Sequence, residues 1–391
     1  MKKVITSERI PIKMWLDTIE DGALNQARNL ANLPFAFKHV AIMPDSHQGY
    51  GMPIGGVLPT KDIVIPNAVG VDIGCGMYAI KLNIKDISYN TLESITNEIK
   101  YSIPLGFKHH KEPQQDWLSI EDIELIRSSR HSIVCHEYNN SLRQLGTLGG
   151  GNHFIEIQKG SDEHIWVMIH SGSRNLGYKV AQYYNAIAKA QNNLWFSSVS
   201  VKDDLAFLPL HSEYGLEYMN EMRLCISFAK LNRFFMMNKV LDIIDKVNGK
   251  VNVLRDIDIA HNYADIENHF GHNVVVHRKG ATRARLGEFG IIPGSQGTSS
   301  YIVKGLGNPE SFMSCSHGAG RLMSRKKAKE NLNLENEIKL MNDKNIIHSI
   351  ESKDNLDEAS GAYKNIDEVM WNQRDLVEID VKLEPLAVVK G

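Results

Sequence analysis

The apolar positions of the chain recur with two different periods, one typical of helices and the other of strands. Helical spacing predicts helices at residues 18–33, 90–101, 119–128, 178–194, 213–247, 321–330, 332–342 and 365–373. Short apolar or alternating runs predict strands at residues 38–43, 53–60, 77–84, 153–158, 165–170, 274–279, 300–305 and 375–391. Because these elements mix without βαβ regularity, the pattern predicts an α+β fold rather than a doubly wound sheet.

The longest helical stretch, residues 213–247, carries a stripe of Met and Phe side chains. A cofactor groove is one interpretation of this stripe, but a helix buried along one side is the simpler one. No shift in composition and no linker interrupts the chain, so we expect one domain over residues 1–391.

Many glycines gather in five short stretches that also hold polar side chains able to bind ligands. These stretches are residues 67–77, 146–156, 169–177, 293–300 and 314–321. Glycine permits positive φ and lets the backbone approach a phosphate closely. The position of these loops between apolar strands predicts a polar site.

Composition narrows the class of protein only slightly. The formal net charge of −2 neither supports nor excludes nucleic acid, because a basic groove can exist within a neutral total. The first residues have no apolar stretch after their lysines, so no signal peptide is expected, and no run reaches the roughly 18 apolar residues of a membrane span. The four cysteines form no CxxC pair, which predicts free thiols in a reducing cytoplasm.

Five residues of the glycine-rich and neighbouring segments have side chains that bind metals. They are Asp72, Cys75, His153, His170 and His261. Each has an ordinary alternative, such as a turn-forming Asp, a buried Cys or a hydrogen-bonded His. Together they suit one or two transition-metal ions, and ligand softness would favour zinc. The spacings match no structural zinc pattern, so a catalytic site is favoured. His269 and His272 also fit a polar surface.

His317 lies in SCSHGAGR, where glycines leave its ring uncrowded. A nucleophile, a base, a metal ligand and a plain turn histidine all remain open for this position. Basic residues occupy 278–285 and 321–329, and both segments adjoin the ligand-rich loops. Such runs are usually solvated helix faces, but the position of these two segments beside the ligand-rich loops favours contacts with phosphates.

These motifs together resemble the RtcB family of RNA ligases, in the family's order from about residue 11 to residue 391. The segments that carry the resemblance are PDSHQGYGMPIGGVLPT, NAVGVDIGCGM, LGTLGGGNHFIEI, HSGSRNLG, VVHRKGATRA, IIPGSQGTSSYIV, CSHGAGRLMSR and the terminal VKG. The resemblance implies one α+β unit with a β-sandwich-like core of mixed sheets surrounded by helices.

The resemblance also implies a metal centre and a nucleophile. Cys75 is similar to a cysteine that bridges two manganese ions. Asp72 and His261 would complete one metal site, and His153 and His170 the other. Manganese conflicts with the softness argument, and the resemblance takes precedence for metal identity. His317 is similar to the histidine that GTP guanylylates before GMP passes to an RNA 3′-phosphate.

Further residues match nucleotide or phosphate contacts of the family. Glu156 would accept hydrogen bonds from the guanine edge, Phe154 would stack on the base, and Lys390 would contact the guanine. Other matching nucleotide contacts are Asn152, Ser295, Ala319, Gly320 and Tyr363. Arg174 and Arg278 would contact RNA or triphosphate oxygens. Asp45 and His47 lie near the site in the family, with no role assigned.

The resemblance implies an enzyme that joins RNA 3′-phosphate or 2′,3′-cyclic phosphate ends to 5′-hydroxyl ends, in RNA repair or tRNA splicing. A cytoplasmic monomer is expected, with an activating protein as a further candidate partner and no membrane contact. Departures at Ser46, Asn175 and Ser360 are compatible with a bacterial RNA-repair paralogue. The alternatives are a metal-dependent cyclic-phosphate esterase without ligation and a non-catalytic module that binds RNA ends.

Overall fold

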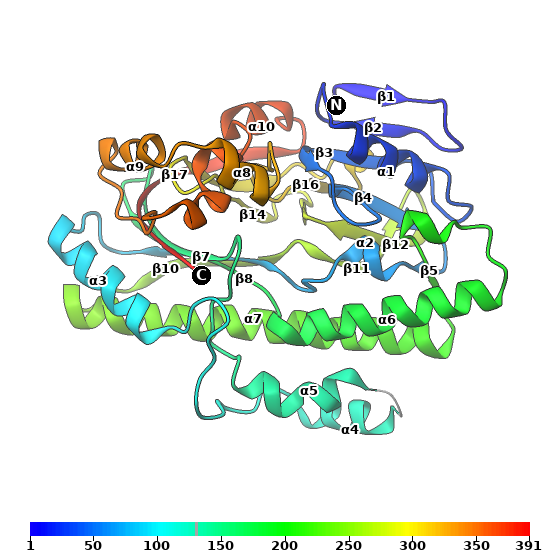
Figure 1. Ribbon diagram of the computed structural model, residues 1–391, viewed down its shortest axis with the longest axis horizontal. Coiled ribbons are helices and arrows are strands. Elements are labelled where there is room, and N and C mark those ends of the chain that lie inside the picture. The colour runs from blue at the N-terminus through cyan, green and yellow to red at the C-terminus, as the bar shows by residue number, and fades with distance from the viewer. Residues whose placement is uncertain (130–131) are drawn as a thin grey trace.

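Two large β-sheets form the centre of the molecule, a computed structural model that describes residues 1–129 and 132–391 (Figure 1). The six-stranded sheet has the order β1 (Lys3–Ile5), β2 (Ile12–Met14), β3 (Val40–His47), β4 (Ile54–Thr60), β12 (His272–Lys279) and β11 (Asn262–His269). The seven-stranded sheet has the order β10 (Val253–Ala260), β6 (Gly76–Leu82), β8 (Ile165–Ser171), β7 (Phe154–Gly160), β17 (Val377–Lys390), β15 (Ser300–Gly305) and β14 (Phe289–Ile292). Two small pairs join β5 (Ile63–Val64) to β9 (Leu208–Pro209) and β13 (Ala281–Arg283) to β16 (Ser314–Ser316).

Helices surround these sheets. They are α1 (Asp21–Ala31), α2 (Pro66–Val69), α3 (Tyr89–Ser102), α4 (Ile120–Ser128), α5 (Ile133–Leu142), α6 (Arg174–Leu194), α7 (Glu213–Asn248), α8 (Arg325–Asn331), α9 (Leu334–Asp343) and α10 (Ile366–Asn372). The short 3₁₀ helices are η1 (Val201–Asp203), η2 (Pro309–Ser311), η3 (Lys353–Glu358) and η4 (Ser360–Ala362). The α+β prediction is confirmed, and the single-domain expectation stays a prediction.

The register of the seven-stranded sheet aligns residues from four distant segments. His170 on β8 lies opposite Met77 on β6 and opposite Phe154 on β7, and Phe154 lies opposite Lys390 on β17. β8 is buried along its whole length, as expected of a strand inside a sheet that is covered on both faces. The sheet therefore carries a metal-ligand candidate, an aromatic ring and the penultimate lysine in one row.

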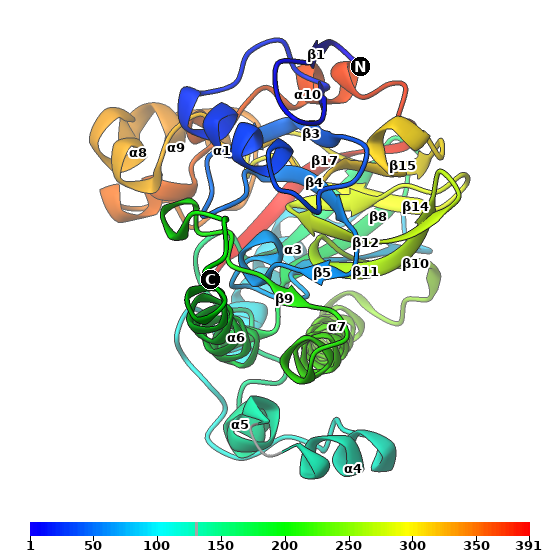
Figure 2. The ribbon, with the colours of Figure 1, turned by 90° about the vertical axis from the view of Figure 1, so that its right-hand side faces the viewer.

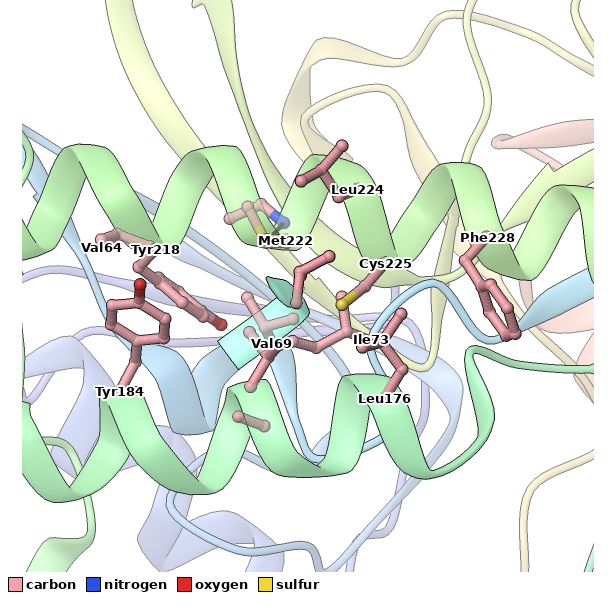
Figure 3. Packing of buried hydrophobic residues seen from close by; sticks show 14 of the residues in the cluster. Val64, Val69, Ile73, Leu176, Tyr184, Tyr218, Met222, Leu224, Cys225 and Phe228 are labelled. Carbon is pink, nitrogen blue, oxygen red and sulfur yellow. Dashed lines mark hydrogen bonds between the residues drawn. The ribbon is translucent and has the colours of Figure 1, made fainter. Parts of the chain in front are cut away.

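Helices α6 and α7 pack side by side beneath the sheets. Figure 3 shows Leu176 and Tyr184 of α6 pointing toward Tyr218 and Cys225 of α7. Phe228 and further Met residues of α7 are also buried. The prediction of a helix buried along one side is thus confirmed for residues 213–247. In Figure 2, α4 and α5 lie on the outer side of α6 and α7.

Several sequence predictions differ from the structure. The helix predicted at 321–330 begins only at Arg325, because Ser324 caps α8 and Arg321 forms a β-bridge with Tyr363. Helix α5 and strands β1, β2, β10 and β11 were not predicted. The prediction of a polar surface position is wrong for His269, which is buried on β11 against Glu267. His272, in contrast, is exposed. Within the described residues, no helix has the length and apolar character needed to cross a membrane.

Candidate metal centre and nucleotide pocket

A thiol and three imidazoles meet at the ends of strands β6, β7, β8 and β10. Cys75 Sγ lies 3.3 Å from His170 Nε2 and 3.5 Å from His153 Nε2. His170 Nε2 lies 3.3 Å from His261 Nε2. All four side chains are buried. The ligand atoms of Cys75, His153 and His170 lie within 4.8 Å of one another, close enough to share one ion.

The outer nitrogens of two of these rings face backbone carbonyls. His153 Nδ1 lies 3.0 Å from Leu148 O, and His170 Nδ1 lies 3.1 Å from Asn152 O. A carbonyl accepts a hydrogen bond, so each Nδ1 carries the proton and each Nε2 offers its lone pair to the cluster. Metal-bound histidines are usually oriented in this way. Lone pairs that converge without a proton between them are stabilised by a cation, so the donor set fits a metal.

Burial controls the protonation of the cluster. Burial, reinforced by neighbouring imidazoles, lowers the pKa of His170 and of His261 well below the usual value, so both rings are neutral. Burial and the Asp72 carboxylate raise the pKa of the Cys75 thiol well above its usual value. A bound cation would supply the charge that stabilises the thiolate, so metal binding and thiol deprotonation are coupled.

Asp72 joins the cluster from the loop before β6. Its Oδ2 lies 3.1 Å from His153 Nε2, and its side chain keeps 32% of its surface exposed. The structure brings all five expected ligands together, but it pairs Asp72 with His153 and His261 with His170. The expected division into one set with Asp72 and His261 and another with His153 and His170 stays a prediction.

His317 lies next to the cluster and is oriented by Asp45. The ring centroids of His317 and His261 are 4.9 Å apart. His317 Nδ1 donates to Asp45 Oδ2 at 2.6 Å, and the same oxygen accepts the backbone N–H groups of His317 and Gly318. Burial alone would raise the pKa of Asp45, but His317 and Lys364 lower it below its usual value. A carboxylate at this position leaves His317 Nε2 with its lone pair free.

The loop after His317 needs glycine at one position. Gly320 has φ +74°, and a Cβ there would lie 2.0 Å from Asp45 O. Lys364 donates from its side chain to Pro44 O at 3.2 Å and to Ser46 O. The close packing of this loop on β3 therefore holds Asp45 beneath His317. The sequence did not indicate this role for Asp45.

Beside the cluster, β7 and β17 form one wall of a small pocket. Of the eight residues expected to bind the nucleotide, six line it: Asn152, Phe154, Glu156, Ser295, Tyr363 and Lys390. Ala319 and Gly320 do not line it and instead follow His317 in its loop. Lys390 Nζ lies 5.6 Å from the centre of the Phe154 ring. The structure therefore brings most of the expected nucleotide contacts into one place.

The pocket contains a buried carboxyl and a buried amine. Burial raises the pKa of Glu156 to about 8, although Lys390 and Gln158 act in the opposite direction. Burial also lowers the pKa of Lys390, which Glu358 and Glu156 partly offset. Burial thus disfavours the charged form of both groups, so binding of a polar partner can change their protonation.

Glu358 is a lining residue that the sequence did not indicate. It accepts from Arg325 Nε at 2.7 Å, from Arg321 Nη1 at 3.1 Å and from the Tyr363 hydroxyl. Its segment has no glycine cluster and no neighbouring strand, so no pattern marked it. Glu358 holds Tyr363 and two arginines of the basic segment 321–329 against the pocket.

The two arginines expected to contact phosphates lie in different surroundings. Arg174 donates to Thr147 Oγ1 and to Gly106 O, both at 3.2 Å, beside the loop that carries His153. Arg278 is fully buried and binds Glu267, Ser314 Oγ and Phe312 O. Among the described residues, no hydrogen bond joins Arg278 to the other candidate site residues. A phosphate contact of Arg278 stays a prediction that this geometry does not support.

The α+β fold and the sulfur–nitrogen donor cluster define a candidate metalloenzyme. Residues 26–391 match the family model described as tRNA-splicing ligase RtcB. The chain belongs to the RtcB family, which supports an RNA-ligase role.

Curated relatives match over nearly the whole chain. The chain is 38% identical over 410 residues to the RNA-splicing ligase RtcB of Escherichia coli (strain K12), a match that covers 100% of this chain and 99% of that protein. It is 33% identical to the tRNA-splicing ligase RtcB of Nanoarchaeum equitans and 31% identical to that of Thermococcus kodakarensis. Each of these two matches covers 95% of this chain and 92% of the relative.

Proposed function

We propose that the chain joins RNA 3′-phosphate or 2′,3′-cyclic phosphate ends to 5′-hydroxyl ends through a histidine–GMP intermediate. The observation that carries this proposal is the position of His317, whose Nδ1 donates to Asp45 at 2.6 Å while its ring lies beside the metal-ligand cluster. An imidazole held in this tautomer presents Nε2 as a nucleophile, and the carboxylate stabilises the positive charge that develops on the ring.

The proposed reaction has three steps. Nε2 of His317 attacks the α-phosphorus of GTP, a P–N bond forms, and pyrophosphate leaves. An oxygen of the RNA 3′-phosphate then attacks the same phosphorus, the P–N bond breaks, and the imidazole is released. Finally the 5′-hydroxyl attacks the activated 3′-phosphorus, loses its proton, and GMP leaves. A 2′,3′-cyclic phosphate would first be opened by water to a 3′-phosphate.

Manganese is the proposed metal, with two ions per site. Asp72, Cys75, His153, His170 and His261 would hold the ions. When bound, such a pair neutralises charge on attacking and leaving oxygens. The residues of the chain keep this site dry and orient the rings, since the four thiol and imidazole ligands are buried.

GTP is the proposed nucleotide because of the carboxyl of Glu156 in the pocket. An ionised Glu156 accepts hydrogen bonds from N1–H and N2–H of guanine. Adenine offers no such pair, so ATP would leave a buried carboxylate without partners. Phe154 and Lys390 flank the same pocket and are placed to contact the base.

RNA joining tests the proposal directly. Incubation of a 3′-phosphate RNA and a 5′-hydroxyl RNA with manganese and GTP is expected to give the joined strand, and ATP is expected to give little. Glu156→Ala should relax this preference for GTP, and an unaltered ratio would argue against its role. Opening of cyclic phosphate without joining would instead support the esterase. Comparison of a cleaved tRNA anticodon loop with cleaved ribosomal RNA would test whether the chain is an RNA-repair paralogue.

A further inference from the structure

A solvent-exposed phenylalanine lies at the edge of the candidate site. Phe107 is 98% exposed and occupies the turn between Leu105 and Lys108, which the Lys108 N–H closes on Leu105 O at 3.1 Å. Gly106, with φ +62°, supplies the left-handed backbone that this turn requires. The side chain thus extends into solvent from a tight turn and gains little from packing within the chain.

The backbone around Phe107 is fixed to the loop that carries His153. Gly106 N donates to Gly149 O, and Leu148 N donates to Pro104 O, both at 3.0 Å. Arg174 Nη2 also donates to Gly106 O. A Cβ on Gly149 would lie only 2.7 Å from His153 Nδ1. The turn is therefore separated from the metal-ligand cluster by a single layer of backbone.

The turn also adjoins the end of the chain that forms the nucleotide pocket. A Cβ on Gly106 would lie 4.0 Å from the Gly391 carbonyl carbon, and the preceding Lys390 lines the pocket. In Figure 1 the segment after α3 passes beside the C-terminus. Phe107 therefore belongs to a turn that adjoins both the loop of His153 and the end of the chain that carries Lys390.

The residues next to Phe107 are basic. Lys108, His109 and Lys111 are exposed, and residues 106–111 include no acidic side chain. An exposed aromatic ring flanked by cations is the combination that binds single-stranded nucleic acid, because bases stack on the ring and phosphates pair with the lysines. An apolar partner would make no charged contact with these cations.

We propose that Phe107 is a stacking platform for a base of the RNA substrate close to the end being joined, and that Lys108 and Lys111 bind the adjoining phosphates. This inference rests on the proposed function. It adds a substrate contact outside the metal centre and the nucleotide pocket.

Binding of a short, fluorescent, single-stranded RNA with a 3′-phosphate, measured by anisotropy, tests the proposal. Phe107→Ala should weaken binding by about fivefold or more, the effect of losing one stacked base. Phe107→Tyr should restore it. Phe196→Ala is the matched control, because Phe196 is 94% exposed but lies beyond the far end of α6, about 30 Å from Arg174 at the start of that helix.

A series of RNAs, each with one base removed, shows whether the loss reflects stacking. The RNA that lacks the stacking base should bind Phe107→Ala and the wild type with equal affinity, because the contact is already lost. Lys108→Ala and Lys111→Ala should each reduce the slope of log affinity against log salt by about one. Equal affinity of Phe107→Ala and the wild type for intact RNA, or an equal loss with every abasic RNA, would overturn the proposal.

The binding test separates this inference from the proposed function. A protein that binds RNA through Phe107 but takes no label from GTP would support the stacking platform and refute the histidine–GMP mechanism. A protein that takes the label but binds RNA equally well without the ring would refute the stacking platform alone.

Discussion

His317 Nδ1 donates to Asp45 Oδ2 at 2.6 Å, and this carboxylate also accepts two backbone N–H groups of the same loop. Asp45 is completely buried, whereas 16% of the His317 side chain is exposed. The pair therefore places a fixed anion behind an imidazole whose other nitrogen is accessible. This arrangement selects the nucleophilic tautomer before any substrate binds.

Asp45→Asn should slow guanylylation of His317 by about a hundredfold or more, because a neutral amide does not stabilise the charged ring. The single-turnover rate of label transfer from GTP measures this effect. Thermal unfolding of the same variant would show that the fold persists. A rate close to that of the wild type would show that Asp45 only packs beneath the loop.

Glu156 should make GTP binding depend on pH. Burial raises the pKa of this carboxyl to about 8 in the free protein, while guanine recognition needs the ionised form. GTP binding then releases a proton, so affinity should rise about tenfold per pH unit below pH 8 and level off above it. Labelling at low GTP concentration across this range measures the effect. The same pH slope in Glu156→Gln would show that another group is responsible.

Cys75→Ala should lose most of the affinity for manganese, because the Cys75 sulfur lies beside the Nε2 atoms of both His153 and His170. Calorimetric titration with manganese measures the loss. Cys225→Ala is the matched control, since Cys225 is equally buried but packs among apolar side chains between α6 and α7. If Cys75→Ala binds manganese as tightly as the wild type, Cys75 does not bridge the metal ions.

Arg278 is expected to stabilise the fold rather than bind RNA. It forms a buried ion pair with Glu267, whose pKa it lowers together with His269 against the effect of burial. Arg278→Ala removes the buried cation that pairs with this carboxylate and should reduce the free energy of unfolding by about 3–5 kcal/mol. Urea denaturation measures this. Arg285→Ala, at a half-exposed position near Glu267, should cost at most about 1 kcal/mol. If Arg278→Ala has normal stability but binds RNA more weakly, Arg278 contacts phosphate rather than stabilising the fold.

The sequence identified the chemical groups of the site better than their arrangement. Glycine loops marked the segments of Cys75, His153 and His170, because flexible backbone next to polar ligands is visible in the sequence. The row of Met77, His170, Phe154 and Lys390 could not be predicted, because it depends on which distant strands pair.

The burial of Arg278 could not be predicted from the sequence either. Sequence placed this residue in a basic run, but its partner Glu267 lies on the neighbouring strand β11, where His269 contacts the same carboxylate. Pairing between β11 and β12 turns a basic segment into part of the core. Glu358 was missed for a related reason, since its two arginine partners come from a loop and a helix that precede it by more than thirty residues.

The most direct test of the account is incubation with manganese and α-labelled GTP, followed by a denaturing gel and acid treatment of the labelled band. We expect a covalent, acid-labile label on the wild type that is absent from His317→Ala. A label that persists in His317→Ala would contradict the nucleophile, and no label on a wild type that has bound manganese would contradict the histidine–GMP intermediate.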